Sequence, residues 1–399
     1  MNYDIVIVGG AMTGTTLALA LSAFTNAKMK IAVLERQPSK QHQQSGFDAR
    51  CIALSDGSCQ KFAQIILPDG QNLWQKIQPF STHIEQIHVS DKGHSGIVEF
   101  SAREFHLQQL GAVIELQQAG QILLQAVEQS DNIDYLCPVE IAHIERSQDG
   151  VKISLKNDRT LTAQLLIGAD GTKSEVASAV NISQEMLHDY GQTAIIANVQ
   201  TQQPHQNRAF ERFTTEGPLA LLPMKDNLIS LVWCVRHADE LLQAGENAFL
   251  TRLQQQFGWR LGRFQRCGQR FAYPLTLSRA AQHVQARTVL IGNAAQTLHP
   301  IAGQGFNLGI RDVMTLANIL SYAYLQQQEI SDDALLQQYE NKRKADQKQM
   351  IQLTDGLLTI FANNLLPLQI GRNLGLMALA QSSMLRQYFA KPTLGWISL

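Results

Sequence analysis

The chain has 399 residues, of which 45% are hydrophobic and 17% are charged, and its formal net charge is −1. A chain of this length usually forms two domains, and the composition is that of a soluble globular protein. The near-neutral charge argues against a nucleic-acid-binding protein, whose surface is normally basic.

Cysteines and histidines give no pattern of a metal site or a disulfide frame. The five cysteines are scattered, odd in number and without CxxC spacing, which favours free thiols in a reducing compartment. The histidines form no HExxH or HxH pair, so we expect no protein-ligated metal. The sequence shows neither an export signal nor an apolar run of about 18 residues, so we expect a cytoplasmic protein without a membrane span.

The N-terminal segment has the pattern of a strand, turn, helix and strand. Residues 3–8 are almost wholly apolar, as a strand buried on both faces requires. Glycines follow, residues 15–24 have a helical composition, and an apolar run at 31–34 ends at Glu35. This order predicts the βαβ unit of a parallel sheet.

The middle of the chain changes character twice. Residues 104–130 are predicted to be helical, and residues 150–168 to form two strands around the turn-forming residues 156–158. Between about 190 and 275, alternating β-rich runs predict an antiparallel sheet.

A buried strand at 288–292 then precedes a glycine-rich loop and a helix from about 305, and residues 346–399 are predicted to be helical. The simplest architecture is a nucleotide-binding domain interrupted by a mostly antiparallel β domain. The expected nucleotide-binding parts are 1–75, 101–185 and 276–345, the β-rich parts are 76–100 and 186–275, and the helical C-terminal region is 346–399.

The turn between the first strand and helix is Gly9-Gly10-Ala11-Met12-Thr13-Gly14. Gly9 permits a tight turn, Gly14 permits close helix–strand packing, and the helix N-terminus offers free N–H groups to a pyrophosphate. Glu35 stands where an acidic residue binds ribose hydroxyls, which favours FAD or NAD over NADP. Ala11 replaces the middle glycine of GxGxxG. The alternative is an incidental glycine-rich turn.

Two more glycine-rich segments follow predicted strands. One is GADGTKS at 168–174, and the other is GNAAQTLHPIAGQGFN at 292–307. The second leaves a buried strand and enters a helix, whose start can stabilise negative charge on a planar ligand such as reduced flavin. Each segment alone is equally compatible with a structural turn or loop.

Together, the three segments resemble those of the group A flavoprotein monooxygenases, built like para-hydroxybenzoate hydroxylase, over nearly the whole chain. Within that superfamily the chain resembles the ubiquinone-biosynthesis hydroxylases, most closely those acting on a 2-polyprenyl-6-methoxyphenol. The runs that carry the closer resemblance are GFDAR at 46–50, IAL at 52–54, AFERF at 209–213, GPLALLPM at 217–224 and LHPIAGQGFNLG at 298–309.

The resemblance implies an α/β fold in which a Rossmann-like FAD-binding domain is interrupted by a β substrate domain and followed by a helical tail. It implies FAD as cofactor and NAD(P)H and O2 as cosubstrates, with a phenol oxygenated through a flavin C4a-hydroperoxide. The residues expected to hold FAD are Gly9, Gly10, Ala11, Met12, Thr13, Gly14, Glu35, Arg36, Arg50, Gln121, Asp170, Gly171, Gly292, Asn293, Pro300, Gly303, Gln304, Gly305, Phe306 and Asn307.

By the same resemblance, the flavin face where oxygen reacts would be lined by Pro300, Gly303, Gln304 and Gly305. Glu211 and Arg212 are neighbours on a predicted strand, so one of them should face the substrate, and Arg212 is the predicted contact.

Ala177, Asn293 and Gln296 stand where the superfamily usually has Arg, Asp and His. The substitutions Ala11, Ala177 and Asn293 keep open the alternative of a flavin-bearing assembly subunit without turnover. An isoprenoid double-bond reductase of the same fold is the other alternative.

The tail from 353 to 397 is rich in leucine and poor in charge. A polyprenyl phenol resides in the bilayer, so this segment is a candidate contact with a membrane or with proteins of a ubiquinone-biosynthesis complex. The alternative is an ordinary helical cover on the FAD-binding domain. The sequence leaves the oligomeric state open.

Overall fold

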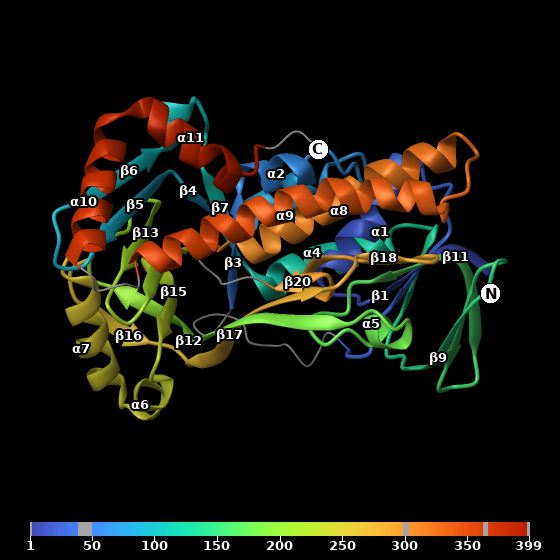
Figure 1. The fold of residues 1–399 in the computed structure, drawn as a ribbon, viewed down its shortest axis with the longest axis horizontal. Helices are drawn as coiled ribbons and strands as arrows, with labels where there is room; N and C mark the ends of the chain where they lie inside the picture. The colour runs from blue at the N-terminus through green and yellow to red at the C-terminus, as the bar shows by residue number, and fades with distance from the viewer. Residues whose placement is uncertain (1, 39–49, 298–302, 362–365, 397–399) are drawn as a thin grey trace.

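The computed structural model describes residues 2–38, 50–297, 303–361 and 366–396. An eight-stranded sheet occupies one end of the molecule and a nine-stranded sheet the other (Figure 1). The eight-stranded sheet has the order β18 (Val284–Gln285), β19 (Thr288–Leu290), β11 (Thr160–Gly168), β1 (Asn2–Val8), β2 (Ile31–Leu34) and β8 (Ile133–Leu136). An antiparallel extension from β11 is formed by β10 (Val151–Leu155) and β9 (Ile141–Arg146).

Five neighbouring strands of this sheet, β19, β11, β1, β2 and β8, are parallel, which confirms the predicted βαβ unit. Ile5 and Ile7 are buried on one side of β1, and Val6 and Val8 on the other, as a strand covered on both faces requires. Helices α1 (Met12–Phe24), α4 (Leu116–Glu128) and α8 (Gln304–Leu325) contribute to the larger of these two cores.

The helix predicted at 104–130 is only partly correct. Helix α4 begins at Leu116, and the preceding residues Gly111–Glu115 form strand β7. This strand pairs with β3 (Cys51–Ser55) and β4 (Thr82–Ile84), where its apolar side chains Ala112, Val113 and Ile114 are buried. Tertiary pairing with two strands distant in the sequence therefore decides the local structure here. Two short helices, α2 (Asp56–Phe62) and α3 (Leu73–Ile77), complete this region, and a third, α5 (Glu175–Ala179), packs on β11.

The nine-stranded sheet confirms the antiparallel sheet predicted between 190 and 275, with one parallel pair, β13 and β5. Helices α6 (Ala238–Gln243) and α7 (Glu246–Phe257) cover one of its faces. Its strands are β20 (Gln296–Thr297), β17 (Phe271–Ala280), β12 (Gln184–Thr201), β15 (Leu228–Val235), β14 (Pro218–Pro223), β13 (Arg208–Phe213), β5 (Gln86–Asp91) and β6 (Ile97–Ser101), with β16 (Phe264–Cys267) also paired to β12.

Helices also form the C-terminal region, as predicted. The long helix α9 (Asp333–Phe361) packs on α8 and extends along the molecule toward the nine-stranded sheet (Figure 1). Helix α10 (Leu366–Gln381) packs on β6, and α11 (Ser383–Leu394) follows it. The tail therefore covers both halves of the molecule, because α9 packs on α8 and α10 packs on the β-rich sheet. The exact domain boundaries stay a prediction.

Candidate active site

The predicted glycine-rich segments meet at one edge of the parallel sheet. The neighbouring strands β19, β11, β1 and β2 end at residues 290, 168, 8 and 34, and each motif follows one of these ends. Ligands of open α/β sheets bind beyond the carboxyl ends of the strands. The order of the strands therefore brings together residues that are almost 300 positions apart.

The first turn is packed so closely that it excludes side chains. A Cβ atom on Gly14 would lie 1.9 Å from the Gly9 carbonyl oxygen, and a Cβ on Gly9 would lie 2.4 Å from the Ala169 carbonyl oxygen. Gly9 also has φ +106°, a conformation that favours glycine. Ala11 stands at the N-cap of α1 with its side chain exposed, and Met12 and Thr13 begin the helix. The turn thus presents backbone, as a pyrophosphate site requires.

Glu35 holds this turn in shape. Its Oε2 accepts a hydrogen bond from Gly10 N at 2.8 Å, and its Oε1 accepts one from Gln37 N at 2.8 Å. The Tyr135 ring covers the other side of Gly10, where an added Cβ would lie 2.8 Å from the ring. Tyr135 comes from β8, and sequence analysis gave no signal for it. Arg36 points elsewhere and pairs with Glu175 at 2.6 Å, with both side chains exposed.

Replacing Glu35 by alanine is expected to weaken FAD binding by about 1.5–3 kcal/mol, the scale of hydrogen bonds to a charged group. Isothermal titration of the apoprotein with FAD measures the loss. Arg36→Ala is the neighbouring control and should change the dissociation constant far less. An unchanged affinity in Glu35→Ala would remove this carboxylate from the binding site.

The segment after β11 contributes an unsatisfied carboxylate. Asp170 Oδ2 accepts a hydrogen bond from Val176 N at 3.0 Å, whereas its Oδ1 is buried without a hydrogen-bond partner among the described residues. Burial raises the pKa of this carboxyl above its usual value. Gly171 has φ +85° with open space where a Cβ would stand. A buried acceptor and a bare backbone position fit the hydroxyl groups of a bound dinucleotide.

The segment after β19 packs directly on the first turn. A Cβ on Gly292 would lie 3.0 Å from Thr13 Cγ2, and Gly292 has φ +59°. Its backbone N–H donates to the buried Asp312 Oδ2 at 3.0 Å. The following residue, Asn293, is exposed at the same edge and is free to meet a ligand. The carboxylate Asp312 was not identified from the sequence.

Gly303 is the N-cap of α8 and has φ +62°. An added Cβ would lie 3.3 Å from Ala53 Cβ, whereas Gly305 has open space beside it. The amide of Asn307 donates to the carbonyl oxygens of Gly303 at 2.7 Å and Ala53 at 3.0 Å, and its Oδ1 accepts from Ser55 N at 2.8 Å. Asn307 therefore ties the start of α8 to strand β3, and it is buried rather than presented to a ligand.

The other residues predicted to hold FAD are spread over several elements. Phe306 packs against the larger core of the nucleotide-binding half. Arg50 donates to the Tyr273 hydroxyl at 3.0 Å, which links β3 to the nine-stranded sheet, and Gln121 is exposed on α4. Pro300 and the side chain of Gln304 lie outside the described residues, as does the run 46–49.

The face of the nine-stranded sheet opposite α6 and α7 reaches Ala53, which lies beside Gly303. We call it the inner face; across β5, β13, β14, β15 and β12 it carries half-buried side chains, Val89, Glu211, Ala220, Leu222, Val232 and Ile196. Alternate residues such as Phe210 and Trp233 point the other way and are buried against α6 and α7. The inner-face side chains keep accessible area, so the inner face is not fully covered, and we call the accessible space in front of it the hollow. Leu222 and Ala53 belong to one apolar cluster, and Ala53 contacts the Gly303 position.

Glu211 faces this hollow, and Arg212 does not. The Arg212 guanidinium donates to the Gln256 carbonyl oxygen at 2.9 Å and to Ser90 Oγ at 3.1 Å, on the side of α7. The structure thus points Arg212 away from the inner face, because neighbouring residues of a strand alternate between faces. Of these two neighbours, Glu211 therefore lies on the inner face, whereas the sequence-based prediction named Arg212.

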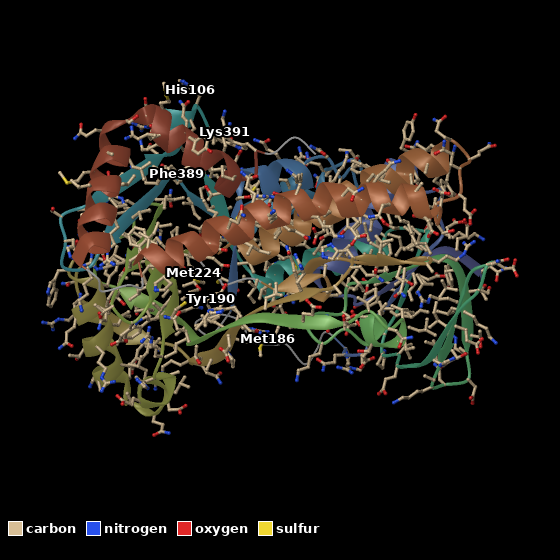
Figure 2. The ribbon with its side chains drawn as sticks, in the orientation of Figure 1. His106, Met186, Tyr190, Met224, Phe389 and Lys391 are labelled. Carbon is tan, nitrogen blue, oxygen red and sulfur yellow. The ribbon has the colours of Figure 1, made fainter. Side chains whose placement is uncertain are left out.

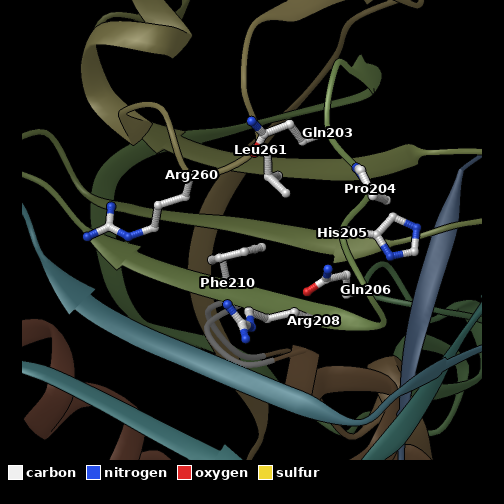
Figure 3. Close-up of a pocket in the computed structure, with 8 residues that line it drawn as sticks. All are labelled: Gln203, Pro204, His205, Gln206, Arg208, Phe210, Arg260 and Leu261. Atoms are coloured by element: carbon white, nitrogen blue, oxygen red, sulfur yellow. The ribbon is translucent and has the colours of Figure 1, made fainter.

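A second hollow of about 300 Å³ lies on the α7 side of the sheet (Figure 3). Its lining includes Arg208, Phe210 and Arg260, which are separated from the Gly303 loop by the thickness of the sheet. Within the described residues, no group of three or more His, Cys, Asp or Glu side chains is arranged to hold a metal ion.

The glycine turn, the partnerless Asp170 oxygen and the open positions at Gly171 and Gly305 fit a flavin dinucleotide laid along the strand ends. A family model described as an FAD binding domain matches residues 2–354. The chain belongs to this family. It is an FAD-dependent monooxygenase, and its curated relatives include hydroxylases of ubiquinone biosynthesis.

Two relatives are similar over almost the whole chain. Ubiquinone hydroxylase UbiL of Rhodospirillum rubrum is 33% identical, with 99% of this chain and 90% of that protein covered. The 3-demethoxyubiquinol 3-hydroxylase of Escherichia coli is 33% identical, with 98% of each protein covered. Among solved structures, p-nitrophenol 4-monooxygenase PnpA of Pseudomonas putida has a TM-score of 0.79 at 15% identity over 98% of both chains. This likeness confirms the expected fold.

Proposed function

We propose that this protein hydroxylates the aromatic ring of a polyprenyl phenol in ubiquinone biosynthesis, with a substrate of the 2-polyprenyl-6-methoxyphenol type. The main support is the apolar inner face, since Ala220, Leu222, Val232 and Ile196 offer aliphatic walls to a ring and a prenyl chain. Of these residues, Leu222 shares an apolar cluster with Ala53, which lies beside Gly303, the position that would meet the flavin ring.

When bound, FAD would supply the oxidising chemistry, with NAD(P)H and O2 as cosubstrates. The chain itself would hold the ADP half at the Gly9–Gly14 turn and Glu35. It would place the flavin ring against the start of α8, and the inner face would orient the phenol and exclude water.

The test uses purified holoprotein with a short-chain 2-prenyl-6-methoxyphenol, NADH or NADPH, and isotopically labelled oxygen gas. We expect substrate-stimulated oxidation of the nicotinamide and one labelled oxygen atom in the product by mass spectrometry. Reduction of a prenyl double bond without labelled oxygen would support the reductase alternative. FAD binding without any turnover would support the assembly subunit.

We also propose that α10 and α11 meet the membrane from the aqueous, cytoplasmic side. Four apolar side chains there are strongly exposed, Leu374 at 60%, Met377 at 51%, Met384 at 78% and Tyr388 at 75%. Residues 366–396 contain no acidic residue. Arg372 and Arg386 form ion pairs with Asp91 and Glu104, and the exposed Lys391 is the basic residue that would meet an anionic lipid headgroup. Phe389 and Lys391 lie on α11 in the same part of the molecule as His106 (Figure 2). The five free cysteines suit a reducing compartment.

Two observations concern this surface. Among the described residues, no helix combines the length and apolarity that a bilayer span needs. Phe361 and Leu376, by contrast, are buried against Val98 and Phe213 of the β-rich sheet, so α10 packs on the sheet by one side and leaves Leu374 and Met377 exposed. Leu365 and the side chain of Leu366, which belong to the leucine-rich tail, lie outside the described residues.

The double substitution Met384→Glu with Tyr388→Glu is expected to weaken binding to vesicles of phosphatidylcholine and phosphatidylglycerol by about tenfold or more. Burial of one large apolar side chain is worth roughly 1.5–3 kcal/mol. Co-flotation with vesicles measures binding, and FAD content and melting temperature should stay at the parent values because both side chains are exposed. Tyr322→Glu with Leu325→Glu, at the far end of α8, is the matched control. Equal flotation of both double variants would contradict the proposal, and lost binding to a partner protein alone would favour a protein contact.

A further inference from the structure

Glu211 is a carboxyl group without a partner in an apolar setting. It lies in the middle of β13, and on the inner face it is flanked across the sheet by Val89 and Ala220. Within the described part of the chain, it makes no hydrogen bond and no ion pair. Its side chain nevertheless keeps accessible area. A buried carboxylate without partners is costly, so its retention at this position calls for a ligand that supplies a donor.

Apolar clusters enclose the space in front of Glu211. Two residues before it, Ala209 packs with Ala53 and Leu222 in the cluster that reaches the Gly303 loop. Two residues after it, Phe213 stacks on Phe361 with ring centroids 3.8 Å apart. Along a strand such positions are about 7 Å from each other, so Glu211 stands between the flavin-side cluster and the α9–α10 wall.

The ionisable side chains on the surrounding elements either have another partner or are uncharged. On β5 and α10, Asp91 and Arg372 form a buried ion pair at 2.7 Å. On β12, the Tyr190 hydroxyl donates to Asp355 of α9 at 2.7 Å. On β15, Cys234 is the neighbouring ionisable group, and burial raises the pKa of its thiol, so it stays neutral. Among these ionisable groups, Glu211 is therefore the carboxylate that could accept a hydrogen bond from a polar group in the hollow.

We propose that Glu211 accepts a hydrogen bond from a ring hydroxyl of the substrate and takes its proton, which makes it a catalytic residue; this rests on the proposed phenol hydroxylation. The step is a proton transfer. The phenol O–H bond breaks, the proton moves to a Glu211 carboxylate oxygen, and the phenolate keeps the electron pair. No oxidant or reductant takes part.

The surroundings of Glu211 suit this task. Burial raises the pKa of its carboxyl from 4.5 to about 7. A stronger base lies closer to the pKa of about 10 of a phenol, which makes proton transfer easier near neutral pH. The resulting phenolate has a more electron-rich ring, and such a ring reacts more readily with electrophilic oxygen. Aliphatic neighbours keep water from competing for the carboxylate.

A binding experiment on the holoprotein tests this role without turnover. The probes are 2-methoxyphenol and 1,2-dimethoxybenzene, which has the same ring but no hydroxyl. With 2-methoxyphenol at pH 8, we expect Glu211→Gln to bind at least tenfold more weakly than the parent protein, because the amide is a weaker acceptor for the phenol hydroxyl than the carboxylate. Both proteins should bind 1,2-dimethoxybenzene equally. Glu185→Gln, an exposed glutamate on β12, is the matched control and should behave as the parent.

The pH dependence gives a second readout. For the parent, kcat/KM should fall about tenfold per pH unit below pH 7, where Glu211 becomes protonated. Glu211→Gln should lack this limb, and Glu211→Asp should recover part of the affinity for 2-methoxyphenol. A parent protein that binds both probes while Glu211→Gln binds 2-methoxyphenol as tightly as the parent would overturn the role of Glu211 alone. Failure of the parent to bind either probe would overturn the proposed function as well.

Stability gives a third readout, with a definite sign. Because the folded-state pKa is raised, the folded protein holds the proton more tightly than the unfolded chain, and stability is lost as pH rises from about 4.5 to about 7. Glu211→Gln removes this loss. The melting temperature of the variant should therefore exceed that of the parent at pH 8, and this gap should shrink at pH 5. A gap that does not change with pH would overturn the raised proton affinity of Glu211.

Discussion

Asp312→Ala is expected to lower the free energy of unfolding by about 3–5 kcal/mol, the cost of removing one partner from a buried ion pair. Asp312 lies on α8 with its side chain fully buried, and its Oδ1 accepts from Arg343 Nε of α9 at 2.6 Å. Arg343 also pairs with Asp346 at 2.6 Å, and Asp346 pairs with the buried Arg311 at 2.9 Å. Without Asp312, two buried guanidinium groups would share one carboxylate.

The same substitution should weaken FAD binding, because the Gly292 N–H would lose its acceptor next to Thr13. Urea denaturation and an FAD titration measure the two effects. The control is Glu329→Gln, which breaks an exposed contact with Arg287 and should cost under about 1 kcal/mol. If Asp312→Ala were as stable as this control, the buried network would not hold α8 and α9 together.

Gly303→Val is expected to reduce hydroxylation by about a hundredfold or more, the scale of a misplacement of about 1 Å at a reacting centre. Gly303 has φ +62°, which a β-branched residue adopts only with strain, and its Cβ would lie 3.3 Å from Ala53. The start of α8 must then shift, together with the surface that would meet the flavin ring.

FAD should be partly retained in Gly303→Val, since the Gly9–Gly14 turn and Glu35 are untouched. Turnover is measured by product formation, and bound flavin by absorbance of the purified protein. Gly245→Val is the control, because Gly245 has φ −60° and open space around it. Parent-like turnover in Gly303→Val would place the loop away from the chemistry.

Local patterns were sufficient for two segments of the nucleotide-binding half. An apolar strand, a glycine turn and an apolar helix within the first 24 residues are set by contacts close in sequence, and the structure has β1, the turn and α1 in these places. The same holds for the buried strand β19 and helix α8 on either side of the last glycine-rich segment. These segments could be predicted because their apolar runs and their glycines can be recognised without knowledge of distant contacts.

Long-range packing decided the rest. Residues 111–115 became a strand because β3 and β4 supply its partners. Asn307 became a tie between α8 and β3, although its motif suggested a ligand contact. Tyr135 and Asp312 support the site from β8 and α8, and no local pattern marks them.

The sequence by itself determined the FAD-binding turn and the two later glycine-rich segments that follow predicted strands. It also determined that Glu211 and Arg212 point to opposite faces of one strand. Only the tertiary structure decided which of these two side chains faces the hollow. A period of two defines two faces of a strand but does not say which face another element will cover. Helices α6 and α7 bury the side of Phe210 and Arg212, and Glu211 is left on the inner face.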